Sequence, residues 1–142
     1  MATHKITGTS PASATTETST PVAVGKYDAI RVVAVLQGGT GGTLNPRLQS
    51  SWDGGTTWWD IVSFPQLADG AAPTTRTITL SRLNANTTLT AIGSGTSPAL
   101  AAGTYLDGEF GDMIRAVYTA GSGTSAGTTQ TIWVLGSEAR AR

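Results

Sequence analysis

The stretch Ala-Ile-Arg-Val-Val-Ala-Val-Leu, residues 29–36, decides the fold class of this chain. It is rich in β-branched residues and apolar on both faces except at Arg31. Such a run is typical of a strand that is covered on both sides. We therefore expect residues 29–36 to form a central strand, and the glycines at positions 38, 39, 41 and 42 to form the turn that follows it.

Strand patterns recur on both sides of this stretch, and no segment shows helical periodicity. Residues 75–83 alternate, with threonine and serine on one face and Arg76, Ile78, Leu80 and Arg82 on the other. Further strands are predicted at 113–119 and 128–135, and weaker candidates at 22–24, 83–92 and 105–110. About seven to nine short strands with Gly-rich turns predict a single antiparallel β-sandwich, jelly-roll-like in arrangement.

A β-hairpin is predicted between residues 44 and 64. Its strands, 44–51 and 56–64, flank Trp52-Asp53-Gly54-Gly55, in which aspartate accepts backbone hydrogen bonds and glycine supplies positive φ. Trp58 and Trp59 point to opposite faces, so one is expected to pack inward and the other to face solvent or a partner. We assign Trp58 and Trp133 to the core and leave Trp52, beside the turn, open between core and interface.

Three regions are predicted along the chain. Residues 1–20 are poor in large apolar side chains and are expected to form an extended or flexible N-terminal arm, either a mobile tail or a segment that lies on a neighbouring subunit. The sandwich domain is expected over residues 21–136, and a polar C-terminal tail over residues 137–142.

Composition excludes several classes of protein. The 142 residues include no cysteine, so disulfides and thiolate zinc sites cannot form. Nine Lys and Arg balance nine Asp and Glu, which gives none of the basic excess of non-specific nucleic-acid binders. No run is long and apolar enough for a membrane helix, and residues 1–20 lack the apolar region of a secretory signal. We expect a protein that is used without export. We also expect that a partner can bind its surface at a low desolvation cost, because the surface carries few charged side chains.

Candidate catalytic groups are few. His4 is the sole histidine and stands in the predicted arm, away from any group that could orient it as a base. Asp107, Glu109 and Asp112 could hold a cation through their oxygens, but a polar turn is the favoured interpretation. No pattern brings two of Asp53, Asp60 and Glu109 together for glycoside hydrolysis, and residues 38–42 lack the ending of a phosphate loop. We predict that the protein is not an enzyme and carries no cofactor.

One run resembles a known family. Residues 48–61, Leu-Gln-Ser-Ser-Trp-Asp-Gly-Gly-Thr-Thr-Trp-Trp-Asp-Ile, resemble the "strand, S-x-D-G-x-T-W, D-[IV]" hairpin of small virion proteins of tailed bacteriophages. In such proteins a "hydrophobic-Arg-[AV]" strand, a Gly/Ser/Thr turn and a Thr-rich strand often follow. Residues 113–118, 121–127 and 128–135 are similar to these parts, so the resemblance covers about residues 29–135. The stretch between Phe64 and Met113 is longer than in the compact members.

The resemblance implies a capsid decoration (cement) protein, made in the host cytoplasm and placed on the capsid surface of the virion. Its partners would be the major capsid protein and further copies of itself in a dimer or trimer, without nucleic acid or membrane. The candidate interface residues are Trp52, Trp59, His4, Lys5 and Ile6.

Two alternatives stay open. One is a head–tail or tail-fibre module of a virion with the same sandwich fold. The other is a carbohydrate-binding module in which Trp52 or Trp59 stacks on sugars, since similar hairpins occur in sugar-binding and sialidase-type β modules.

Overall fold

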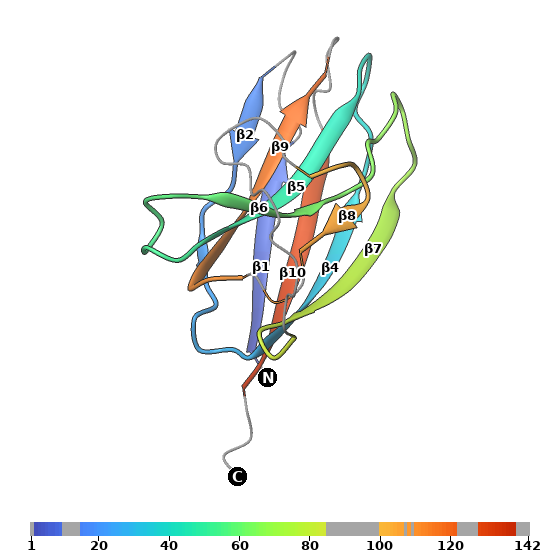
Figure 1. Ribbon diagram of the computed structural model, residues 1–142. Coiled ribbons are helices and arrows are strands. Elements are labelled where there is room, and N and C mark those ends of the chain that lie inside the picture. Colours follow the sequence, from blue (N-terminus) through green and yellow to red (C-terminus); the bar gives the residue numbers. More distant parts are fainter. Residues whose placement is uncertain are drawn as a thin grey trace.

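The computed structural model describes residues 2–9, 15–84, 100–106, 108, 110–121 and 128–138, and these residues form ten strands and no helix (Figure 1). The strands are β1 (Ala2–Thr9), β2 (Thr16–Thr18), β3 (Val22–Ala23), β4 (Ala29–Leu36), β5 (Leu44–Ser51), β6 (Trp59–Ser63), β7 (Thr74–Ser81), β8 (Thr104–Tyr105), β9 (Met113–Ala120) and β10 (Thr129–Ser137). Within this part of the chain, no helix could cross a membrane.

Two antiparallel sheets pack face to face, which confirms the predicted β-sandwich. The four-stranded sheet has the order β1-β10-β4-β7. The six-stranded sheet has the order β2-β9-β5-β6-β8, and β3 also pairs with β9. Because β5 occupies the other side of β9, β2 and β3 together form one interrupted edge. The jelly-roll arrangement that we expected is not confirmed by this strand order.

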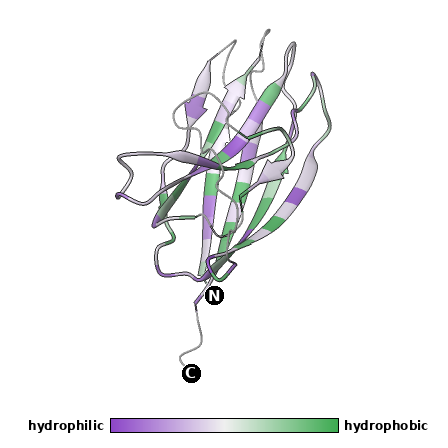
Figure 2. Ribbon diagram, in the orientation of Figure 1, coloured by the Kyte–Doolittle hydropathy of each residue, from purple (hydrophilic) through white to green (hydrophobic). Residues whose placement is uncertain are grey.

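Strand β4 lies inside its sheet, between β10 and β7, as residues 29–36 predicted. Ile30, Val32 and Ala34 are fully buried and point toward the six-stranded sheet. Figure 2 shows hydrophobic residues recurring along the strands of both sheets, whereas β7 is mostly pale. The core therefore lies between the sheets, and the alternation of each strand decides which side chains enter it.

The N-terminal segment is extended, as predicted, but it is not a separate arm. Residues 2–9 are β1, which pairs with β10 from Ala2↔Gly136 to Thr9↔Thr129. Ile6 is 2% exposed, in register with Ile132, and Thr16–Thr18 pair with β9 in the other sheet. The predicted domain start at residue 21 is therefore wrong, because backbone pairing and one buried isoleucine integrate a segment whose composition is polar.

The predicted C-terminal tail begins one residue too early. Ser137 is the last residue of β10, and Glu138 forms an ion pair with Lys26 at 3.3 Å. Residues 139–142 lie outside the described residues, as do residues 85–92 of the weak strand predicted at 83–92.

The core assignment of Trp133 is wrong, whereas the burial of Trp58 is confirmed. Ile132 and Val134 are fully buried, so alternation turns Trp133, which lies between them, to the outer face of the sheet, where it is partly exposed. Trp58 is 7% exposed and packs beneath the guanidinium of Arg115, with 4.2 Å between the guanidinium carbon and the ring centroid.

Candidate protein-binding surfaces

The outer face of the four-stranded sheet is a regular grid of side chains. The strand registers place three rows across β1, β10, β4 and β7: Thr7, Thr131, Val35, Thr75; Lys5, Trp133, Val33, Thr77; and Thr3, Leu135, Arg31, Thr79. Residues in one row share a face of the sheet. The apolar members, Val33, Val35, Trp133 and Leu135, lie on the two central strands and are partly exposed. Threonines surround them on both edge strands.

The charges on this outer face have one sign. Lys5 and Arg31 are exposed, and no carboxylate belongs to the three rows. Arg31 donates from Nε to Oγ1 of Thr77 at 3.4 Å, which keeps its head within the face. The surface thus combines an apolar centre, a neutral hydroxyl rim and two cations. It suits a protein partner that has apolar side chains flanked by carboxylates.

The hairpin tip brings two predicted interface residues together. Trp52 is 44% exposed, and its ring meets that of the partly exposed Trp59 edge to face, with centroids 4.8 Å apart. Gly54 and Gly55 have φ of 69° and 95°, the left-handed conformation for which glycine was expected in this turn. The tip of the hairpin therefore carries a pair of tryptophans on a turn that internal hydrogen bonds stabilise.

Asp53 organises this turn. Its Oδ1 accepts hydrogen bonds from the backbone N–H groups of Thr56 at 3.1 Å and Thr57 at 2.8 Å, and from the hydroxyl of Ser51 at 2.8 Å. These bonds, led by the backbone bond from Thr57, lower the pKa of Asp53 to about 2. The predicted role of aspartate in the turn is confirmed.

Acid is expected to loosen the hairpin. The pKa of Asp53 is lowered in the fold, to about 2, from a usual value near 3.9. Its stabilising effect is therefore complete above about pH 4 and is lost as the pH falls toward 2. Tryptophan fluorescence and urea unfolding between pH 5 and 2 should show a pH dependence that Asp53→Asn weakens. An unchanged profile in that variant would show that Asp53 does not stabilise the turn.

A hollow of about 360 Å³ lies beside Trp52 and is lined also by Gly25, Arg82, Phe110 and Asp112. Arg82 donates to the carbonyl oxygens of Gly25 at 2.8 Å and Phe110 at 3.2 Å, and its guanidinium carbon lies 4.4 Å from the Phe110 ring centroid. Arg82, which directly follows β7, thus links the backbone at Gly25 to the backbone at Phe110.

The three remaining predicted interface residues separate into two roles. His4 is partly buried, and its Nε2 lies 3.1 Å from the hydroxyl of Tyr27. Ile6 belongs to the core, so it cannot contact a partner while β1 stays in the sheet. Lys5 points the other way and lies on the outer face beside Trp133. Of these three residues, Lys5 is the one whose side chain is exposed.

Sequence reasoning missed a buried polar cluster on β5, β6 and β9. Arg47 and Asp60, 1% and 0% exposed, form an ion pair with Nε and Oδ1 3.3 Å apart. Gln49 donates from Nε2 to Oδ1 of Asp60 at 2.9 Å and accepts two hydrogen bonds from Arg115 at 2.8 and 3.0 Å. Burial lowers the pKa of both arginines. The available signal was the spacing of Arg47 and Gln49, which stand two residues apart on a predicted strand and therefore share one face of it.

The predicted cation cluster is described only in part. Asp107 and Glu109 lie outside the described residues. Elsewhere in the described chain, no group of three or more histidines, aspartates or glutamates could hold a metal ion. Asp60, a candidate carboxylate for glycoside hydrolysis, is held in the ion pair with Arg47.

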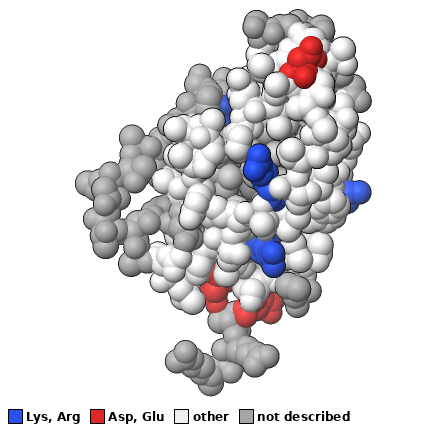
Figure 3. All heavy atoms as spheres, turned by 90° about the vertical axis from the view of Figure 1, so that its right-hand side faces the viewer, with Lys and Arg blue, Asp and Glu red and all other residues white. Residues whose placement is uncertain are grey.

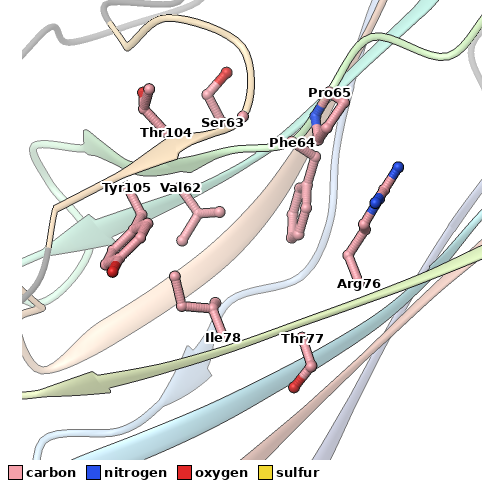
Figure 4. Close-up of a pocket in the computed structure, with 10 residues that line it drawn as sticks. Val62, Ser63, Phe64, Pro65, Arg76, Thr77, Ile78, Thr104 and Tyr105 are labelled. Carbon is pink, nitrogen blue, oxygen red and sulfur yellow. The ribbon is translucent and has the colours of Figure 1, made fainter.

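A second groove, of about 270 Å³, opens between β7 and the β6–β8 edge of the other sheet (Figure 4). Figure 4 shows Val62, Ile78 and Tyr105 pointing toward one another, whereas Thr77 points away from them. Tyr105 is 51% exposed. The sandwich therefore leaves its apolar interior partly open along this side.

Comparisons of this chain with known proteins found no match. No family model matches this chain, and no curated protein and no solved structure matches it either.

Proposed function

We propose that this chain is a structural protein of a tailed-phage particle that binds the outer surface of the capsid and cements neighbouring major capsid subunits. It acts by binding alone. The observation that carries the proposal is the outer face of the four-stranded sheet, where Trp133, Val33, Val35 and Leu135 lie together on two central strands. The resemblance of residues 48–61 and 113–118 to virion proteins supplies the kind of partner.

Burial of this outer face on a partner is favourable for a physical reason. Its aliphatic side chains gain free energy when they leave water, and tryptophan is among the residue types that most often anchor an interface. Lys5 and Arg31 favour a partner surface with carboxylates at matching positions. A ligand that binds the assembled shell and not its separate parts stabilises the shell by mass action.

Co-sedimentation with purified empty shells of the source phage tests the proposal. The protein should pellet in a fixed ratio to the major capsid protein and resist moderate salt, because the contact is largely apolar. Trp133→Glu should weaken binding by at least about tenfold, the effect of losing an interface anchor. Leu83→Glu is the matched control, because Leu83 is 80% exposed and lies outside the outer face.

Two outcomes would contradict this reading. If the protein stays in the supernatant at low salt, it is not a capsid-binding protein, and a head–tail or tail-fibre role comes next. If Trp133→Glu binds as well as Leu83→Glu, the outer face is not the docking surface.

The hollow beside the Trp52–Trp59 pair favours a second candidate, a carbohydrate-binding module. An exposed indole next to a polar hollow can stack on a sugar ring while neighbouring groups bond its hydroxyls. Retention on immobilised polysaccharide that Trp52→Ala abolishes and Trp133→Glu preserves would support it over the capsid role.

A further inference from the structure

Strand β7 is a long edge strand without a bulge. Natural edge strands are usually short or bulged, or carry proline or charged side chains, lysine above all. The six-stranded sheet ends in the short strands β2, β3 and β8, and β1 carries Lys5. By contrast, β7 pairs with β4 without interruption from Ala29↔Ser81 to Leu36↔Thr74, contains neither lysine nor proline, and has Arg76 as its one charged residue. No described strand pairs with its other side (Figure 1).

The ladder with β4 shows which backbone groups of β7 face outward. The N–H of Arg82 donates to the carbonyl oxygen of Asp28 at 2.8 Å, and these two residues continue the β4–β7 register. Hydrogen-bonded pairs alternate along an antiparallel ladder, so Leu80, Ile78 and Arg76 bond toward β4. The N–H and C=O groups of the residues between them, Thr75, Thr77 and Thr79, point away from the sheet, and their side chains are exposed.

We infer that a second copy of this chain adds to this edge, with β7 pairing antiparallel to the partner's β7 about a twofold axis at Thr77. In this register Thr77 lies opposite the partner's Thr77, and Thr75 lies opposite the partner's Thr79. Every outward-facing threonine then exchanges backbone hydrogen bonds with another, and cross-strand threonine pairs are themselves favourable. A twofold axis makes the edge its own complement.

Apolar contacts favour the same partner on the groove side of β7. Ile78 would lie opposite the partner's Arg76, whose aliphatic stem can cover it while the guanidinium reaches water. Tyr105, half-exposed, faces Ile78 across the groove (Figure 4). Figure 3, which faces this side of the molecule, shows a largely uncharged surface with Lys and Arg across its middle and Asp and Glu toward its ends. Few charges must therefore be desolvated when two copies meet.

This inference does not rest on the proposed function. Edge pairing would join two four-stranded sheets into one continuous sheet and place both outer faces on the same side. If the outer face binds a shell, two faces on one rigid body would add avidity. A homodimer that binds no shell would leave the edge pairing intact and overturn the capsid role alone.

Sedimentation velocity of the full chain over a range of concentrations tests the dimer. The sedimentation coefficient should rise with concentration, and Thr77→Pro should keep the protein monomeric, because proline removes an outward N–H while the backbone bonds to β4 stay intact. Thr77→Val keeps that N–H and should still dimerise. The side-chain bond from Arg31 to Thr77 is lost in the proline variant and in this valine control alike. A wild-type chain that stays monomeric at every concentration would overturn the inference.

Single cysteines test the register even if the proline variant fails to fold. The chain has no cysteine of its own, so each introduced thiol is unique. Thr77→Cys places two thiols on opposed residues about 5.5 Å apart at Cα, within disulfide range, and should cross-link on mild oxidation. Thr75→Cys alone should not, because its copies lie more than about 13 Å apart, but it should cross-link with Thr79→Cys in a mixture. Equal cross-linking of Thr75→Cys and Thr77→Cys would overturn this pairing.

Discussion

Replacing Asp60 with alanine is expected to destabilise the fold by about 3–5 kcal/mol, the usual cost of removing one partner of a buried ion pair. Asp60 is 0% exposed and is the carboxylate that pairs with Arg47, itself 1% exposed. The alanine variant would leave the arginine charge buried without that carboxylate and would also remove the acceptor of the Gln49 amide. Urea unfolding followed by circular dichroism measures the loss.

A double variant separates two contributions to the free energy of unfolding: the loss caused by leaving one charge buried without its partner, and the net stabilisation by the intact ion pair. Arg47→Met with Asp60→Leu replaces both charges by apolar side chains and should be less destabilising than Asp60→Ala alone. If Asp60→Ala costs less than about 1 kcal/mol, Asp60 is not the group that holds the Arg47 charge in the fold.

Two neighbouring residues on β10 are expected to respond very differently to truncation. Ile132→Ala should cost about 2–5 kcal/mol, because Ile132 is 0% exposed and packs in the core. Trp133→Ala, which deletes a far larger side chain, should cost no more than about 2 kcal/mol, the scale of its two cross-strand pairs, with Lys5 and Val33. Urea midpoints of the two variants at the same slope give the comparison directly.

The pair of results also bears on function. A small effect of Trp133→Ala on stability, together with weaker binding to shells, would place the tryptophan on a docking surface. A loss comparable with that of Ile132→Ala would mean that the indole is part of the core after all, and the outer face would lose the anchor on which the proposed function depends.

Local sequence was sufficient wherever a signal was short-range. The bounds of β4 and β5 were predicted as they occur, since periodicity and Gly-rich turns act within a few residues. The Asp53 turn was also predicted, because an aspartate side chain bonds backbone groups three and four residues further on. The all-β sandwich follows from these same local patterns.

Long-range pairing decided what the sequence could not. Residues 2–9 look polar by themselves, and only their ladder with β10, more than a hundred positions away, makes them a strand with Ile6 in the core. Trp133 is as apolar as a core residue, yet the register of its strand turns it outward. Arg47 and Asp60 form an ion pair between two strands, and the burial of both residues could not be predicted from their residue types.

By itself, then, the sequence determined the fold class, the principal strands and the hairpin turn, because these depend on neighbours along the chain. Only the tertiary structure decided the surfaces: which face of each strand meets the core, which strand ends each sheet and which side chains lie together on the outer face. The physical reason is that side chains alternate with a period of two, so one choice of register reassigns a whole strand between core and solvent.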